Sequence, residues 1–275
     1  MAILITDSTS DLPLAELDAQ NITMLSLKVS FGQEEFLDKR TITNEAFYEK
    51  LAQSETLPQT TLLSIGAFQE VFDRFPDDDI VVLPISAKLS GTFQSALAAK
   101  ELTGRDNIYV VETGTVSIGL GLLVQRAAQL NEAGMPASEI ASHISEIADR
   151  VRMFAMVDTL KYLVKGGRLS GMQGFLGEML QIKPVISILH GEVLNVAKAR
   201  GTKGAIQALL KLTEQGAPID TSLPLCFGHT GNMALLAQLR DHFPHLSSAP
   251  AYSLGSVVGA HAGPGTTGIA YFTTK

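Results

Sequence analysis

The 275-residue chain has very little cysteine and no long hydrophobic run. Its single cysteine, Cys226, excludes an internal disulfide, and its place between Leu225 and Phe227 is typical of a strand core rather than of a catalytic thiol. No apolar run approaches the roughly 18 residues that a membrane-spanning helix needs. The first residues also lack the basic segment of a signal peptide. We therefore expect a cytoplasmic protein with no transmembrane segment.

The chain also lacks the common signatures of catalysis and cofactor binding. It contains no Gly-x-Ser-x-Gly elbow and no Walker A pattern for ATP. Residues Gly263–Gly268 spell G-x-G-x-x-G, but a strand pattern follows them, whereas a dinucleotide site needs a helix there. The six histidines form no helical metal pair, and the net charge of −7 argues against binding to nucleic acid. We expect no metal, no cofactor and no nucleic-acid partner.

The first half of the chain shows a regular alternation of strand, loop and helix. Because 45% of the residues are hydrophobic and 18% are charged, the chain can bury a sizeable core as two domains or one large one. Short apolar runs followed by helical patterns favour a parallel sheet with helices on both faces. Strands are predicted over Ala2–Thr6, Ile22–Val29, Ile80–Leu83 and Asn107–Val111, with helices from near Pro13, Ser90 and Ser117.

The second half has a different order of elements. A strand over Met153–Val157 precedes a short helix capped by Asp158, and another helix is predicted over Met172–Leu180. Two strands joined at His190–Glu192 are typical of a hairpin. The predicted fold class is therefore α/β, with an N-terminal three-layer, parallel-sheet domain over residues 1–152. A C-terminal α+β domain with a mixed sheet covers residues 153–275.

Polar residues gather where the predicted strands end. The segment Pro84–Ala96 leads from a strand into a helix, where hydroxyls and free N–H groups at the positive end of the helix dipole suit an anionic group. Ser90 within it is equally an ordinary helix cap. Ligands of parallel sheets bind beyond the carboxyl ends of the strands. The loops Asp7–Asp11, Ser86–Ser90 and Glu112–Ser117 should therefore converge.

Hydroxyl groups, one histidine and two arginines are the remaining candidates for a site. Hydrogen-bond donors without a nucleophile, a base and an acid suit holding an oxyanion better than breaking a bond. The apolar stretches Ile118–Val124 and Met172–Leu180 either pack in the core or line a channel. If polar loops cap such a channel, an amphiphile with a carboxylate head is the natural ligand. The candidates are Thr60, Thr61, Ser90, Arg168, Arg200 and His261, the last of these in a loop.

Basic residues concentrate in the window from Thr159 to Gly204. The acidic residues there are Glu178 and Glu192. The window forms either a cationic docking face or a solvated surface without a partner. Its basic residues are Lys161, Lys165, Arg168, Lys183, Lys198, Arg200 and Lys203.

Five segments, in this order, resemble the signatures of the DegV family of bacterial fatty-acid-binding proteins along nearly the whole chain. They are Thr6–Pro13 (TDSTSDLP), Leu89–Ala96 (LSGTFQSA), Lys165–Ser170 (KGGRLS), Lys183–Ile186 (KPVI) and His261–Gly265 (HAGPG). The resemblance implies a two-domain α/β protein that binds a long-chain fatty acid in an apolar tunnel. Residues 1–152 would supply the carboxylate-binding loops and residues 153–275 the apolar tail pocket. It further implies that a separate ATP-dependent fatty acid kinase phosphorylates the presented carboxylate for phospholipid synthesis. The chain itself would then be a lipid carrier and not an enzyme.

The resemblance also implies roles for individual residues. Residues 60–64 read Thr-Thr-Leu-Leu-Ser where the family often has Thr-Ser-Gln-Pro-Ser, so the choice between the two threonines stays open. The alternatives are a hydrolase or phosphotransferase that uses Ser90 or His261, and a regulatory lipid sensor without a kinase. Transient contact with a membrane is compatible with the carrier. The implied carboxylate ligands are Ser90, Gly91, Thr60 or Thr61, and His261, and the residues facing the kinase or its phosphate are Arg168 and Arg200.

Overall fold

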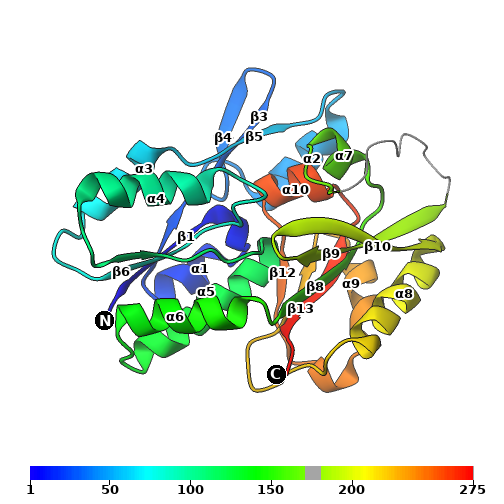
Figure 1. Cartoon of the computed structure of the whole chain (residues 1–275). Coiled ribbons are helices and arrows are strands. Elements are labelled where there is room, and N and C mark those ends of the chain that lie inside the picture. The colour runs from blue at the N-terminus through cyan, green and yellow to red at the C-terminus, as the bar shows by residue number, and fades with distance from the viewer. Residues whose placement is uncertain (171–180, 275) are drawn as a thin grey trace.

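The computed structural model describes residues 1–170 and 181–274. A four-stranded parallel sheet occupies one half of the molecule, with the strand order β2-β1-β6-β7 (Figure 1). All four residues of its central strand β6 are fully buried, as expected for a parallel strand covered on both faces. The strands are β1 (Ile3–Asp7), β2 (Ile22–Leu25), β6 (Ile80–Leu83) and β7 (Ile108–Val110).

Helices cover both faces of this sheet. Ile5 and Val82 pack against α3 (Ile65–Asp73) and α4 (Thr92–Thr103) on one face. Neighbouring residues of the same strands face α5 (Ser117–Glu132) and α6 (Ala137–Ala148) on the other, because successive strand residues point to opposite sides. The short helix α1 (Leu14–Ala19) follows the 3-10 turn η1 (Ser8–Ser10). The predicted three-layer parallel-sheet half is confirmed.

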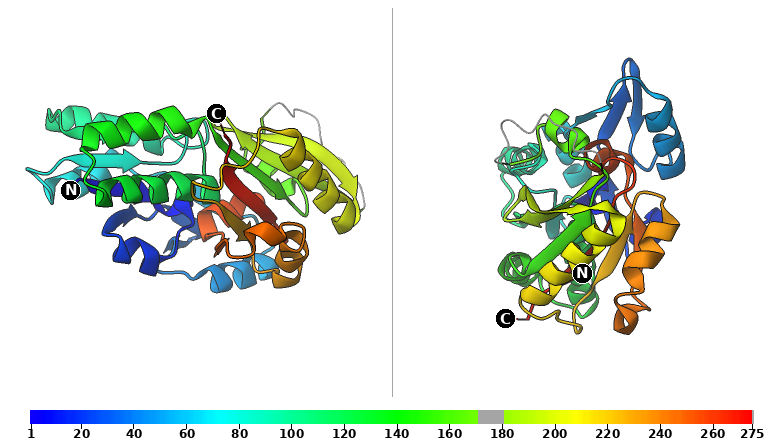
Figure 2. Two further views of the ribbon diagram at one scale, coloured as in Figure 1. Left: turned by 90° about the horizontal axis from the view of Figure 1, so that it is seen from below. Right: turned by 90° about the vertical axis from the view of Figure 1, so that its right-hand side faces the viewer.

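A six-stranded mixed sheet forms the other half, in the order β10-β9-β8-β13-β11-β12. Its one parallel pair among the described strands is β11 with β12. Two helices, α8 (Gly201–Gln215) and α9 (Met233–Arg240), cover the face that turns away from α5 (Figure 2). The predicted mixed sheet is confirmed. Its strands are β8 (Val151–Met156), β9 (Ile182–Leu189), β10 (Glu192–Arg200), β11 (Cys226–His229), β12 (Ala251–Ser253) and β13 (Thr267–Phe272), and a 3-10 turn η2 covers Pro244–Leu246.

A third, three-stranded antiparallel sheet was not predicted. The single strand predicted over Ile22–Val29 is wrong, because the chain leaves β2 at Ser26 and enters another sheet. The Leu27 N–H donates to the Ser8 hydroxyl at 3.1 Å and its carbonyl accepts from Asp38, so its backbone belongs to neither ladder. The third sheet contains β3 (Lys28–Phe31), β4 (Glu34–Leu37) and β5 (Gln59–Thr61), packed near α2 (Asn44–Gln53) and α10 (Ser256–Ala262).

Three smaller predictions have different outcomes. The helix α7 (Lys161–Lys165) begins after Leu160 and is not capped by Asp158, whose carboxylate pairs with Lys183 instead. The helix predicted over 172–180 lies outside the described residues. The division between residues 152 and 153 falls inside β8 and stays a prediction.

The glycines of the Ile118–Val124 stretch serve close packing. A side chain at Gly121 would lie 2.7 Å from the Ser10 carbonyl oxygen, so glycine lets α5 approach the η1 backbone.

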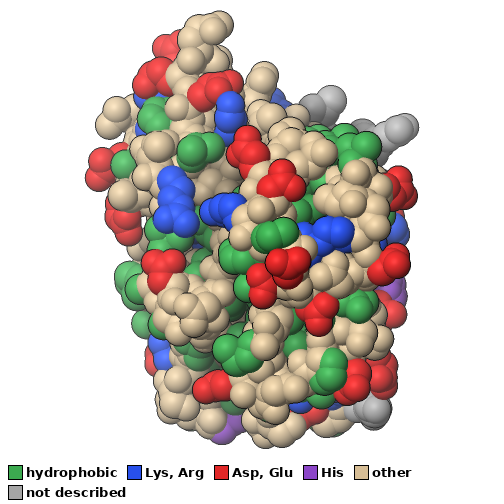
Figure 3. Space-filling view, turned by 90° about the vertical axis from the view of Figure 1, so that its left-hand side faces the viewer, with side chains coloured by type: hydrophobic (Ala, Val, Ile, Leu, Met, Phe, Trp, Pro, Cys, Tyr) green, Lys and Arg blue, Asp and Glu red, His purple; other side chains and the backbone are tan. Residues whose placement is uncertain are grey.

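Within the described residues no helix is long and apolar enough to cross a membrane. On the face shown in Figure 3, acidic side chains are spread widely and basic ones lie among them, so the net negative charge is not gathered in one patch there.

Candidate functional site

A cavity of about 170 Å³ lies where the parallel sheet, the mixed sheet and the small antiparallel sheet meet. The residues that line the cavity come from nearly the whole chain, between Thr9 near the N-terminus and Thr266 near the C-terminus. One part of the wall is apolar, with side chains from neighbouring strands of the mixed sheet. These are Met153 and Ala155 of β8, Ile186 and Ile188 of β9, and Val193 of β10.

The polar part of the wall rests on the three loops that were predicted to converge. The Asp7 carboxylate accepts from the Ile85 N–H at 2.7 Å, which ties the loop after β1 to the loop after β6. The Ser86 N–H donates to the Thr115 carbonyl at 2.9 Å, which adds the loop after β7. The convergence of the loops is confirmed.

Ser90 bonds the first turn of a helix and also lines the cavity. Its hydroxyl accepts from the Thr92 N–H at 3.3 Å and lies 2.9 Å from the Thr92 hydroxyl, so it satisfies the first turn of α4 although Gly91 is the capping residue. Ser90 and Gly91 also line the cavity. A half-buried hydroxyl at the start of a helix is a suitable donor to an anion.

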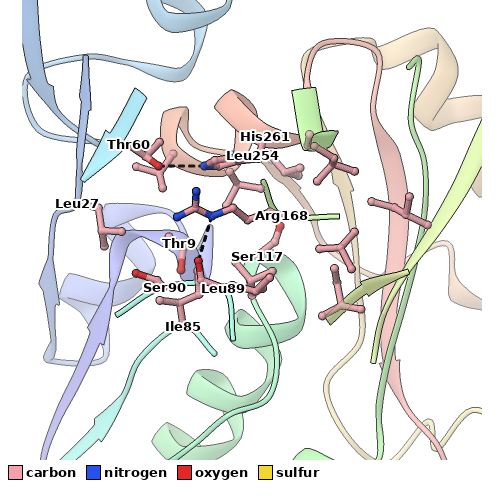
Figure 4. A pocket seen from close by; sticks show the side chains of 18 of the residues that line it. Thr9, Leu27, Thr60, Ile85, Leu89, Ser90, Ser117, Arg168, Leu254 and His261 are labelled. Atoms are coloured by element: carbon pink, nitrogen blue, oxygen red, sulfur yellow. Dashed lines mark hydrogen bonds between the residues drawn. The ribbon is translucent and has the colours of Figure 1, made fainter. Parts of the chain in front are cut away.

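Thr60 and His261 form the second polar contact, at 3.0 Å between Oγ1 and Nε2 (Figure 4). His261 lies in the last turn of α10 and not in the predicted loop, because the helix extends until Gly263, whose φ of 75° ends it. The structure therefore fixes the imidazole on a packed helix. Thr60 lies on β5, in a segment that was predicted only as polar.

The hydrogen-bond partners of the two His261 ring nitrogens indicate which nitrogen carries the proton. Burial, together with the positive charge of Arg168, lowers the pKa of His261 to about 4, so the ring is neutral near pH 7. Its Nδ1 is buried against Gly166 and has no hydrogen-bond partner among the described residues. A proton there would be an unsatisfied donor, so Nε2 carries the proton and donates to Thr60. The Thr60 hydroxyl hydrogen is then free to donate into the cavity.

Thr61 differs from its neighbour although both residues line the cavity. Successive residues of β5 point to opposite sides of the strand. Thr60 is half-buried and bonded to His261, whereas Thr61 is exposed. The two hydroxyls therefore offer a ligand different environments.

Arg168 and Arg200 do not lie together. The Arg168 Nε and Nη1 donate to the Leu89 and Gly166 carbonyls at 3.2 and 2.7 Å, and its guanidinium lies inside the cavity wall between Thr60 and Ser90 (Figure 4). Arg200 is exposed at the end of β10, where it donates to the Gln181 side chain at 3.3 Å. The site thus brings together Thr60, Thr61, Ser90, Gly91, Arg168 and His261, and leaves Arg200 outside.

Of the two alternatives left open for Ile118–Val124, core packing is the one that the structure has. No residue of Ile118–Val124 lines the cavity, because this part of α5 packs in the core. The wall instead uses alternate residues of β8 and β9. The period-two pattern Met153, Ala155 and Ile186, Ile188 was the signal that could have predicted it.

Comparisons with known proteins agree with this architecture. The family described as "Uncharacterised protein, DegV family COG1307" matches residues 2–274. A DegV domain-containing protein of Deinococcus radiodurans is 34% identical over 97% of this chain and 96% of its own, and one of Listeria innocua is 31% identical over 98% of both chains.

Solved structures are also similar over the whole length. A DegV family protein from Thermus thermophilus, described for its fatty acid binding, superposes with a TM-score of 0.87 at 32% identity over 99% of both chains. A DegV lipid-binding protein from Thermotoga maritima gives a TM-score of 0.86 at 28% identity, covering 100% of this chain and 99% of its own. The protein is therefore a member of the DegV family.

Proposed function

We propose that the protein binds a long-chain fatty acid in this cavity and presents its carboxylate to a separate ATP-dependent kinase, which forms an acyl phosphate. The observation that carries the proposal is the joining of neutral donors and one arginine to an apolar wall in a single cavity. A fatty acid has the same division into a charged head and an apolar tail. The fatty acid binding described for the relative from Thermus thermophilus supports it.

The head group is proposed to lie among Ser90, Thr60 and Arg168. The two hydroxyls donate to the carboxylate oxygens and the guanidinium offsets the charge, which strengthens each hydrogen bond. His261 acts through Thr60. The Thr60 oxygen accepts a hydrogen bond from the His261 Nε2–H, so the Thr60 hydroxyl hydrogen is left to donate to the ligand. Gly91 adds a close backbone approach beside Ser90.

The tail is proposed to lie along β8, β9 and β10. Each buried methylene contributes about 0.8 kcal/mol, so a chain of a dozen carbons offsets much of the cost of ordering the ligand. In this assignment residues 1–152 supply Thr60 and Ser90, and residues 153–275 supply the apolar wall with Arg168 and His261. The protein is proposed to work in the cytoplasm, with the fatty acid as its ligand and no other cofactor.

The geometry does not favour a hydrolase or phosphotransferase that uses Ser90 with His261. Such an enzyme needs the base within hydrogen-bond reach of the nucleophile, but the His261 Nε2 is bonded to Thr60 and Ser90 is bonded to Thr92. A pKa of about 4 also makes the imidazole a poor proton acceptor at neutral pH. The carrier is therefore the better proposal for these residues.

Two measurements test the proposal. Organic extraction of the purified protein followed by mass spectrometry should find a fatty acid, or the emptied protein should take one up in calorimetry. Loaded protein mixed with a fatty acid kinase and ATP should then yield an acyl phosphate, and the protein with ATP alone should not. A chain that neither carries nor takes up any fatty acid contradicts the whole proposal, whereas binding without kinase turnover contradicts only the transfer.

A further inference from the structure

Two buried aspartates on separate segments meet at the start of α10. Asp11, in the Thr6–Pro13 motif, is 2% exposed and accepts from the Gly255 N–H at 2.7 Å and from the Ser117 hydroxyl at 2.6 Å. Asp38 is fully buried, and its Oδ1 accepts from the N–H and the hydroxyl of Ser256 at 2.8 and 2.7 Å. Neither carboxyl group lines the cavity.

The two carboxyl groups both lie close to Gly255. A side chain at Gly255 would lie 3.0 Å from both Asp38 oxygens and 3.2 Å from an Asp11 oxygen. The Asp38 Oδ2 is buried without a hydrogen-bond partner among the described residues. The negative charge of Asp38 near the buried Asp11 disfavours ionisation of the Asp11 carboxyl group.

The surroundings of Asp11 favour its protonated form. Burial raises the pKa of Asp11 to about 7, and the charge of Asp38 acts in the same direction. Lys39 opposes this rise. Burial and both aspartates raise the pKa of Tyr48, and burial, Glu16 and Asp11 raise the pKa of Cys226, so these two groups are neutral near pH 7. The Lys39 ammonium donates to the Leu12 carbonyl at 2.9 Å, which ties the two aspartate segments together.

The backbone around the pair is strained. Asp11, Lys39 and Ser117 have φ values of 57°, 62° and 59°, in the left-handed region that residues other than glycine seldom adopt. Such conformations persist where the surrounding contacts determine them, and they concentrate near functional sites. Here the strained residues all belong to the segments that hold the start of α10.

We propose that Asp11 and Asp38 are positioning residues, which hold the start of α10 so that His261, in its last turn, meets Thr60. The helix has only seven residues, so a shift at Ser256 is transmitted directly to His261. The Tyr48 hydroxyl supports the same segment, since it donates to the Leu254 carbonyl at 3.1 Å. The inference rests on the proposed function, because it assigns these residues to the head-group end of the fatty acid site.

The test compares Asp38→Asn and Ser256→Ala with a control, Asp220→Asn. The Asp220 carboxylate also links two segments, because it forms an ion pair with the Arg150 guanidinium at 2.6 Å, but Asp220 does not line the cavity. The first measurement is the ¹⁵N NMR signal of the His261 ring in the protein without ligand. The second is the affinity for a fatty acid and for its methyl ester, which keeps the tail and removes the charged head.

In Asp38→Asn we expect a changed His261 signal, a loss of fatty acid affinity of about fivefold to tenfold, and ester affinity within twofold of wild type. Ser256→Ala, which keeps the backbone donor, should change both readouts less and in the same direction, and Asp220→Asn should change neither. An unchanged His261 signal in both test variants, or equal losses for acid and ester, overturns the inference. If wild-type protein binds neither ligand, the proposed function fails, while a changed His261 signal still supports the positioning role.

Discussion

Replacing Thr60 by valine should separate the hydroxyl that holds the head group from its neighbour. Valine keeps the branched shape that suits β5 and removes only the oxygen that lies 3.0 Å from the His261 ring. Thr61→Val is a matched control, because the same change is made one residue later on the same strand, at an exposed position. We expect Thr60→Val to weaken fatty acid binding and Thr61→Val to leave it unchanged.

The size of the loss follows from the type of hydrogen bond removed. A hydrogen bond to an ionised carboxylate contributes about 1.5–3 kcal/mol, which corresponds to roughly tenfold to a hundredfold in affinity. The contact between Thr60 and His261 is lost in both the free and the bound protein, so it cancels from the binding free energy. The loss of this contact should instead lower the free energy of unfolding by about 1 kcal/mol. Thr61→Val, at an exposed position, should change the free energy of unfolding by no more than about 0.5 kcal/mol.

Calorimetry with a fatty acid and its methyl ester, together with thermal unfolding, measures both quantities. Only the acid should distinguish Thr60→Val from wild type, because the ester has no carboxylate to hold. A larger loss of acid affinity in Thr61→Val than in Thr60→Val would refute the reasoning, including the assignment of the His261 proton.

Other variants test the remaining parts of the site. Ser90→Ala should lower acid affinity by roughly tenfold to a hundredfold in calorimetry, and wild-type binding would place the head group elsewhere. Arg200→Ala should keep fatty acid binding and lower acyl-phosphate formation with kinase and ATP, whereas Arg168→Ala should lower both; identical behaviour of the two arginines would contradict the different places that they occupy. Because the pKa of Asp11 is raised from 3.8 to about 7 in the folded protein, the folded state holds a proton that the unfolded state releases. The contribution of Asp11 to the free energy of unfolding, measured as the difference between wild type and Asp11→Asn, should therefore fall as pH rises through this window, by about 4 kcal/mol at most. Asp11→Asn should remove that decline in urea unfolding at pH 5 and pH 8, and an equally steep decline in the variant would exclude Asp11 as its source.

Local sequence patterns predicted the parts of the fold that local physics determines. The apolar run Ile80–Leu83 predicts a buried parallel strand without any knowledge of its neighbours. The break at Ser26 and Leu27 depends on hydrogen bonds to Ser8 and Asp38, which no local pattern reveals. The helix α10 was missed because glycine in its centre lowers helix propensity. That glycine, Gly259, is needed because a side chain there would lie 2.6 Å from the Tyr48 hydroxyl.

The polar residues of the candidate site were predicted one by one, whereas its apolar wall was predicted only as a part of residues 153–275. Motifs placed Ser90, Thr60 and His261 among the candidates, and these residues line one cavity although they come from distant parts of the chain. The family resemblance and the charge count grouped Arg200 with Arg168, but neither shows on which side of β10 the Arg200 side chain lies. The apolar wall depends on how three strands pair, and that pairing is a property of the whole sheet.

The cavity is lined by residues from nearly the full length of the chain, so a lipid bound there as proposed would contribute to the thermodynamic stability of the protein. A ligand that binds only the folded chain raises the free energy of unfolding by about 2.7 kcal/mol when its free concentration is a hundred times its dissociation constant. Since segments from Thr9 to Thr266 meet around this space, the ligand would complete a core that the side chains leave hollow. Preparations that differ only in their lipid should then unfold at different temperatures, and a melting curve would report how much of the protein is loaded.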